Sequence, residues 1–87
     1  MTARFAYFYF MTNDRARVDV VAPAHAQHWR SLQLREFAGG PFSDRAGGLI
    51  TFAAADRAEA QRAVDGDPFV QEGLLNEHWL KEWVRER

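Results

Sequence analysis

The chain has 87 residues, enough for one domain with a single small hydrophobic core. It contains no cysteine, which excludes disulfide bonds and metal sites built from thiolates. The formal net charge is -1, with both signs scattered, and no apolar run approaches the ~18 residues of a membrane span. We therefore expect one domain over residues 1–87, located in the cytoplasm, with neither nucleic acid nor membrane as a partner.

Residues 4–11 are predicted to form a strand, because aromatic side chains dominate the segment. Successive side chains of a strand point to opposite faces, and here both faces carry rings. One face has Phe5, Tyr7 and Tyr9, and the other has Phe8 and Phe10. A strand of this kind is covered on both sides.

A first helix is predicted over residues 22–35, after a polar turn at residues 12–14 and a polar connection through Arg17. Pro23 suits the first helical turn, where its missing N–H is not needed. Helical spacing places one group of side chains on a shared packed stripe. The group consists of His25, His28, Trp29 and Leu32.

Residues 37–48 are rich in glycine and predict tight turns around at most a short strand. A buried strand is expected over residues 49–53. Asp56 is predicted to cap a second helix that Gly66 closes, since Glu59 stands three residues after the cap.

Asp67 and Pro68 predict a further one or two helical turns, with the aspartate at the cap and the proline in the first position. Residues 77–84 alternate as in a strand, although a terminal helix fits the charges as well. The resulting order is β-α-β-β-α-β, in which helices cover one face of an antiparallel sheet. The aromatic open face then predicts a homodimer with its sheets face to face.

Five segments together resemble the YCII-related family over nearly the whole chain. They are APAHAQHW (22–29), GGPFSDRAGGLITF (39–52), AEAQRAV (58–64), GDPFVQEGLL (66–75) and HWLKEW (78–83). The resemblance implies an α+β, ferredoxin-like fold with a four-stranded antiparallel sheet that forms a dimeric α/β barrel, related to muconolactone isomerase. It also implies a site built from a helix histidine, matched by His25, and an aspartate, matched by Asp44 or Asp67.

A histidine oriented by a carboxylate can exchange protons near neutral pH, which makes His25 the candidate general acid/base. The alternative is a histidine at the core edge bonded to a carbonyl group. Asp44 lies in a glycine-rich turn where aspartate often bonds nearby N–H groups, and for Asp67 capping is the first explanation.

His28 stands one helical turn after His25, so the two could bind a metal ion, with His78 or Asp44 as a third ligand. Packing or pocket lining is the more common use of such a pair, and we expect no metal and no cofactor. A further set of aromatic residues could form a pocket wall or plain core. The set consists of Trp29, Phe42, Phe52 and Phe69.

The leading hypothesis is a cofactor-independent lyase- or isomerase-type enzyme acting on a small organic substrate, a class that includes aromatic-derived compounds. The alternative is a non-catalytic module that binds a small molecule or assembles as a dimer or a larger homo-oligomer.

Overall fold

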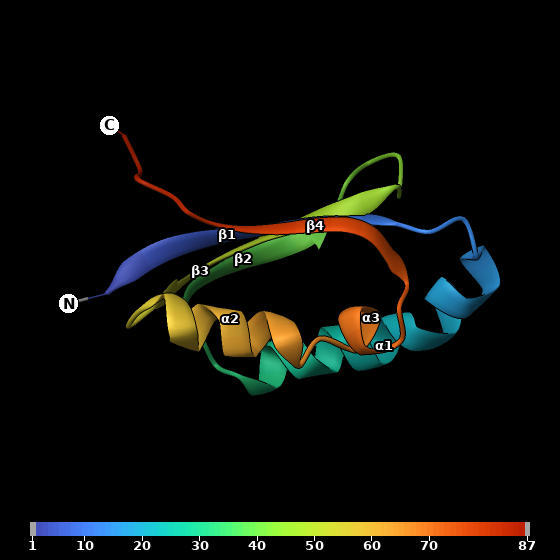
Figure 1. The fold of residues 1–87 in the computed structure, drawn as a ribbon, viewed down its shortest axis with the longest axis horizontal. Coiled ribbons are helices and arrows are strands. Elements are labelled where there is room, and N and C mark those ends of the chain that lie inside the picture. Colours follow the sequence, from blue (N-terminus) through green and yellow to red (C-terminus); the bar gives the residue numbers. More distant parts are fainter. Residues whose placement is uncertain (1, 87) are drawn as a thin grey trace.

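A computed structural model describes residues 2–86, and in these residues a four-stranded sheet has its helices on one face (Figure 1). The elements follow the order β1 (Ala3–Met11), α1 (Arg15–Ser31), β2 (Arg35–Pro41), β3 (Gly47–Ala54), α2 (Arg57–Asp65), α3 (Pro68–Gln71) and β4 (Leu75–Glu82). The strand order is β2-β3-β1-β4, and every neighbouring pair is antiparallel. This confirms the predicted α+β, ferredoxin-like fold, with the short α3 placed just before β4.

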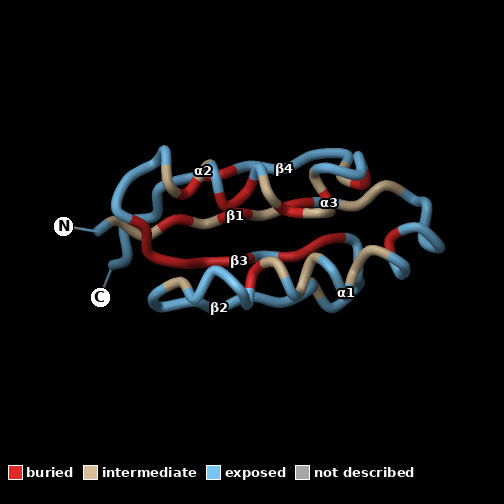
Figure 2. The backbone as a smooth tube through the Cα atoms, turned by 90° about the horizontal axis from the view of Figure 1, so that it is seen from below, coloured by how far each residue is buried: buried red, intermediate tan, exposed pale blue. Residues whose placement is uncertain are grey.

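The alternation of β1 determines which side chains form the core. Phe5, Tyr7 and Tyr9 are buried on the face that the helices cover. Tyr7 pairs across the sheet with Ile50 of β3 and Leu80 of β4, which are also buried. The buried residues therefore concentrate along β1 and β3 between the sheet and the helices (Figure 2).

The prediction that the first helix begins at Ala22 is wrong, because α1 begins at Arg15. Asp14 is the true cap, and its side chain accepts the Arg17 N–H at 3.2 Å. Pro23 lies inside the helix on its exposed side, and without a backbone N–H it cannot make the helical hydrogen bond to the carbonyl of Asp19. Leu32, which we placed on the packed stripe, is the C-terminal cap and is 37% exposed.

The glycine-rich region contains more strand than the sequence predicts. β2 has seven residues, all exposed, and pairs with β3 along one edge of the sheet. The pairing register shifts between Arg35 and Ala38, where Glu36 adopts a positive φ of 52°. An edge strand with glycines and a bulge shows no alternation of apolar and polar residues, which explains why the pattern was not visible in the sequence.

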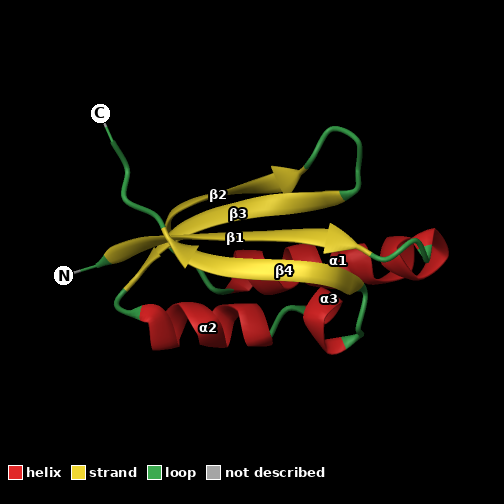
Figure 3. Cartoon of the chain, turned by 45° about the horizontal axis from the view of Figure 1, so that its top comes forward, coloured by secondary structure: helices red, strands yellow, loops and turns green. Residues whose placement is uncertain are grey.

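The remaining elements confirm their predictions. Asp56 caps α2 by accepting the Glu59 N–H at 2.9 Å, and Gly66 ends that helix. Asp67 caps α3, and the last segment is the strand β4 rather than a helix. Figure 3 shows the helices on one side of the sheet and the other side open. No helix within residues 2–86 is long and apolar enough to cross a membrane.

Candidate active site

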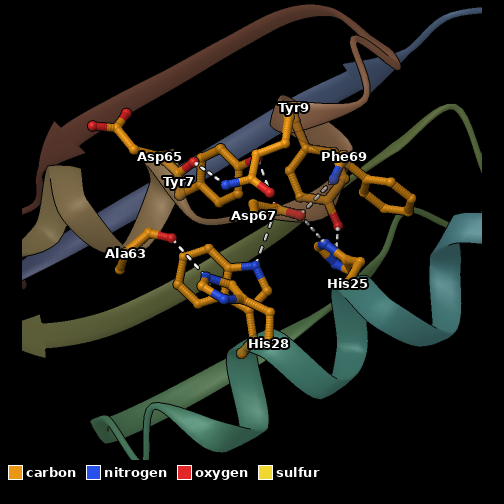
Figure 4. Close-up of polar contacts among 10 residues, drawn as sticks. Tyr7, Tyr9, His25, His28, Ala63, Asp65, Asp67 and Phe69 are labelled. Atoms are coloured by element: carbon orange, nitrogen blue, oxygen red, sulfur yellow. Dashed lines mark hydrogen bonds and ion pairs between the residues drawn. The ribbon is translucent and has the colours of Figure 1, made fainter.

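The buried carboxylate of Asp67 is the centre of the site (Figure 4). It has no exposed surface and accepts four hydrogen bonds. One oxygen, Oδ1, accepts from the Phe69 N–H at 2.9 Å and contacts Nδ1 of His25 at 2.8 Å. The other, Oδ2, accepts from the Tyr7 hydroxyl at 3.0 Å and from Nε1 of Trp29 at 3.1 Å. The cap of α3 thus also joins β1 and α1.

His25 is fixed by this carboxylate and by two rings. Because a carboxylate only accepts hydrogen bonds, Nδ1 of His25 carries a proton and donates a hydrogen bond to Asp67. The imidazole stacks on Phe69, with ring centroids 4.2 Å apart and an interplanar angle of 19°. Its second nitrogen, Nε2, lies 3.3 Å from the hydroxyl oxygen of Tyr9. With 14% of its side chain exposed, His25 is held firmly but stays in reach of a small molecule.

The charges around Asp67 keep it ionised. Burial by itself raises the pKa of Asp67, but the hydrogen bond and charge of His25 outweigh that effect, together with the N–H groups of Phe69 and Trp29, so the pKa is lowered. Burial, followed by the negative charge of Asp67, raises the pKa values of the Tyr7 and Tyr9 hydroxyls. Both phenols therefore remain protonated and can act as hydrogen-bond donors.

A cavity of about 380 Å³ opens beside His25, between α1 and the sheet strands β1, β2 and β3. Its wall includes Tyr9, His25, Trp29 and Phe69, so the imidazole and the Tyr9 hydroxyl border the same space. A cavity of this size suits a small organic molecule.

Gly48 makes room for the Tyr9 hydroxyl. It stands opposite Tyr9 in the pairing of β1 with β3, and a Cβ atom there would collide with the hydroxyl oxygen and the ring of Tyr9. At Gly40, on the neighbouring strand, a Cβ atom would meet nothing within 4 Å. The absence of a side chain at Gly48 therefore allows the contact between Tyr9 and His25.

Four residues of the predicted site lie together, namely His25, Asp67, Trp29 and Phe69. Trp29 and Phe69 border the cavity with His25, and both are also buried. Phe52, which we placed in the pocket wall, is a core residue with no exposed surface, and its ring lies 5.6 Å from that of Trp29. Phe52 therefore packs against Trp29, which lines the cavity, and does not line the cavity itself.

Other predicted site residues lie elsewhere in the described chain. Asp44 is exposed in the turn between β2 and β3, where its Oδ1 accepts the Ala46 N–H at 2.9 Å. Phe42 lies on the open face of the sheet and stacks on Phe10 at 5.8 Å. His28 is turned toward α2, where its Nε2 lies 2.8 Å from the carbonyl oxygen of Ala63 (Figure 4). Within one chain, Asp67 and not Asp44 therefore pairs with His25.

The two imidazoles of α1 also have separate surroundings, one at Asp67 and one at α2. Within residues 2–86, no group of three or more His, Asp or Glu side chains is arranged to hold a metal ion.

Sequence reasoning missed Tyr7 and Tyr9 as parts of the site. The signal was present, since both fall on the buried face of β1, and a buried tyrosine usually needs a partner for its hydroxyl. The partner of Tyr7 is Asp67, sixty residues later in the chain, and no local pattern could indicate it.

The arrangement has the geometry of a general acid/base. Asp67 holds the proton on Nδ1, so Nε2 of a neutral His25 is a hydrogen-bond acceptor, and it accepts from the Tyr9 hydroxyl at 3.3 Å beside the cavity. A proton taken up at Nε2 would create an imidazolium next to an ionised carboxylate, and that charge pair stabilises it.

Solved structures with the same fold were found for the whole chain. The chain is 20% identical to 5-chloro-2-hydroxyhydroquinone dehydrochlorinase (TftG) from Burkholderia phenoliruptrix, solved in complex with 2,5-dihydroxybenzoquinone, with a TM-score of 0.80 and 95% of each chain covered. A dimeric ferredoxin-like protein from Thermobifida fusca gives 12% identity and a TM-score of 0.58, covering 98% of this chain and 92% of that one. SnoaB, a cofactor-independent oxygenase from Streptomyces nogalater, gives 17% identity and a TM-score of 0.53, covering 99% of this chain and 95% of that one. At these identities the likeness shows the shared fold alone.

No curated protein matches the sequence. The model of the YCII-related domain matches residues 5–84, which is nearly the full length and includes both His25 and Asp67. The chain belongs to the YCII family.

Proposed function

We propose that this protein is a small cofactor-independent enzyme that moves protons on a small organic substrate. In this proposal His25 is the general acid/base, Asp67 positions it, and the Tyr9 hydroxyl donates a hydrogen bond to a substrate oxygen. The observation that carries the proposal is the 2.8 Å contact between Nδ1 of His25 and the fully buried Asp67, which leaves Nε2 beside the cavity.

The proposed step begins with a substrate C–H bond next to a carbonyl group, which includes the keto tautomer of a hydroxylated ring. Nε2 of His25 takes the proton, and the electron pair of the C–H bond moves into the substrate to form an enolate or an equivalent anion. With substrate bound, the Tyr9 hydroxyl, whose raised pKa keeps it protonated, turns from Nε2 and donates instead to the substrate oxygen that gains charge. The proton is then returned to another atom, or a leaving group departs with its electron pair, which corresponds to isomerisation or elimination.

The related structures support this chemistry as an option for the fold. One of them is a dehydrochlorinase solved with a bound dihydroxybenzoquinone, and another is a cofactor-independent oxygenase. Since substrate choice lies in the pocket and does not follow from the fold, we take from them only the substrate class, a small cyclic organic compound.

The test uses proton exchange, which does not require the natural substrate. Small carbonyl compounds and hydroxylated aromatic compounds, including 5-chloro-2-hydroxyhydroquinone, are incubated with the protein in D₂O and followed by NMR. We expect C–H exchange or turnover that falls by about 10²-fold or more in His25→Asn, the usual contribution of a general base. His78→Asn, an exposed histidine on β4, is the matched control.

Two results would contradict the enzymatic proposal. One is an exchange rate that stays the same in His25→Asn. The other is a loss of ligand affinity in that variant without any turnover by the wild type, which would favour a binding module.

We also propose that the protein works as a homodimer, with the open face of the sheet covered by a second copy. Aromatic and aliphatic side chains gather on that face and remain partly exposed. They are Phe8, Phe10, Phe42, Leu49 and Trp79, and Phe8 stacks on Trp79 at 5.3 Å. An exposed patch of this composition is typical of an interface. Light scattering that gives the mass of one chain at micromolar concentration would contradict the dimer.

A further inference from the structure

The cavity beside His25 has an excess of positive charge on its wall. Arg15, Arg30 and Arg45 line it, against one acidic residue, Asp19. The whole chain has a formal net charge of -1, so the excess belongs to this wall and not to the composition. A guanidinium group stays protonated at any physiological pH.

Two of these arginines meet at one end of the cavity. Arg15 is the first residue of α1, and Arg45 lies in the turn between β2 and β3. Nη1 of Arg15 donates to the Arg45 carbonyl oxygen at 3.4 Å, which links the helix to the turn. The turn is itself held by Asp44, whose carboxylate accepts the Ala46 N–H. These two contacts hold the turn against the start of α1, so both arginines line the same cavity.

The cavity arginines differ from two others in their partners. Arg4 pairs with Glu36, and Arg17 pairs with Glu72. Within residues 2–86, by contrast, no carboxylate lies within 4.0 Å of the guanidinium nitrogens of the three cavity arginines. Among the described residues, the side-chain partner of Arg30 is the neutral Gln27, to which it donates at 3.3 Å. The chain thus leaves these cations available to a ligand of opposite charge.

The charged end and the imidazole lie along one helix and border one cavity of about 380 Å³. Arg15 precedes His25 by ten residues on α1, about 15 Å along the helix axis. The wall between them contains the apolar Met11, Val18 and Ala22 and the acidic Asp19.

We propose that the substrate is a small organic anion whose carboxylate binds Arg15 and Arg45 while its unsaturated or ring portion reaches Nε2 of His25. Planar guanidinium groups hold a carboxylate through paired hydrogen bonds, which fixes the orientation of the ligand as well as its charge. The inference rests on the proposed function for the reactive end, but anion binding at the other end can be measured without any turnover.

The experiment compares two probes of equal shape and different charge, 4-hydroxybenzoate and 4-hydroxybenzamide. The full chain, labelled with ¹⁵N, is titrated with each probe and followed by NMR. We expect the benzoate to bind at least about 10-fold more tightly, the effect of one charge-assisted hydrogen bond or more. We also expect its affinity to fall as salt is raised, because the two arginines lie at the rim.

The variants Arg15→Gln and Arg45→Gln should each lower benzoate affinity and leave benzamide affinity unchanged. Arg62→Gln, an exposed arginine on α2 away from the cavity, is the matched control. Arg45→Lys keeps the positive charge and should keep part of the preference for the benzoate over the benzamide. It provides a second measurement of that preference if the glutamine variants fold poorly. Equal affinity for both probes, absence of benzoate binding at millimolar concentration, or an unchanged preference in both glutamine variants would overturn the proposal.

The variant His25→Asn separates this inference from the proposed function. If the anion proposal holds, His25→Asn still prefers the benzoate, because the two arginines are intact, and this result is expected whether or not the wild type turns over any substrate. Loss of the preference in a folded His25→Asn would contradict an anion site located at Arg15 and Arg45.

Discussion

The aromatic residues on the two faces of the sheet are covered to different extents. On the helix side, Tyr7 and Tyr9 are covered by the chain itself, and both hydroxyls have partners in the Asp67 and His25 group. On the open side, Phe10 and Trp79 are each 37% exposed and contact mainly one another and neighbouring rings. The same strand, β1, carries both Tyr7 and Phe10. The helix side is therefore complete within one chain, whereas the open side lacks a cover.

The largest expected effect is on the helix side. Asp67→Ala leaves donors of Tyr7, Trp29 and His25 without an acceptor in a buried place, so the free energy of unfolding should fall by about 3–5 kcal/mol. Urea unfolding followed by fluorescence measures the change. Asp44→Ala, at the exposed turn, is the control and should cost far less. A loss below about 1 kcal/mol in Asp67→Ala would mean that the buried network does not organise this face.

A charged residue on the open face of the sheet tests whether a second copy of the chain covers that face. Trp79→Glu should weaken self-association by about 2 kcal/mol or more, the usual cost at a central aromatic position, and should leave the fold of a single chain intact. Light scattering over a concentration series measures the association, and circular dichroism checks the fold. Val20→Glu, on the exposed side of α1, is the matched control because Val20 is 76% exposed and lies away from this face. Equal association of both variants would place the dimer interface elsewhere.

A methyl group at Gly48 tests whether the contact between Tyr9 and His25 matters on the helix side. Gly48→Ala should push the Tyr9 hydroxyl away from Nε2 of His25, because the new Cβ collides with it, and should lower stability by about 1–3 kcal/mol. The rate of proton exchange should fall as well. Gly40→Ala has free space and should change neither quantity much. If both alanine variants behave alike, the contact of Tyr9 with His25 has no role in the site.

The smallest effect concerns the acid dependence of Asp67. Because its pKa in the folded chain lies below the unfolded value of about 3.9, the ionised carboxylate stabilises the fold above that pH, and the contribution is lost as the pH falls through the folded pKa. A ¹³C NMR titration of the carboxyl carbon should show a midpoint below the ordinary value. In His25→Asn the midpoint should move upward, since the hydrogen bond and charge of His25 lower it. A midpoint above about 4 in the wild type would contradict the ionised pair.

The sequence predicted much of the fold from local rules. The alternation of β1, the cap of α2 at Asp56 and the Asp-Pro start of α3 each depend on a few neighbouring residues, and each agrees with the structure. Two local patterns predict the wrong structure. Residues 12–14 predict a turn and Pro23 predicts a helix start, which places the beginning of α1 near Ala22 instead of Arg15, and the glycines of β2 hide an edge strand.

Five sequence segments were enough to indicate the family, and local helical and strand periodicity indicated the order of elements and placed His25 and Trp29 on one stripe of a helix. The tertiary structure alone decided which aspartate meets His25, since 42 residues separate His25 from Asp67 and only the packing of α1 against α3 brings them together. It also decided that Tyr7 and Tyr9 join the site, and that Arg15 and Arg45 share one cavity. Contacts between distant segments depend on how whole elements pack, and no spacing within a single element encodes them.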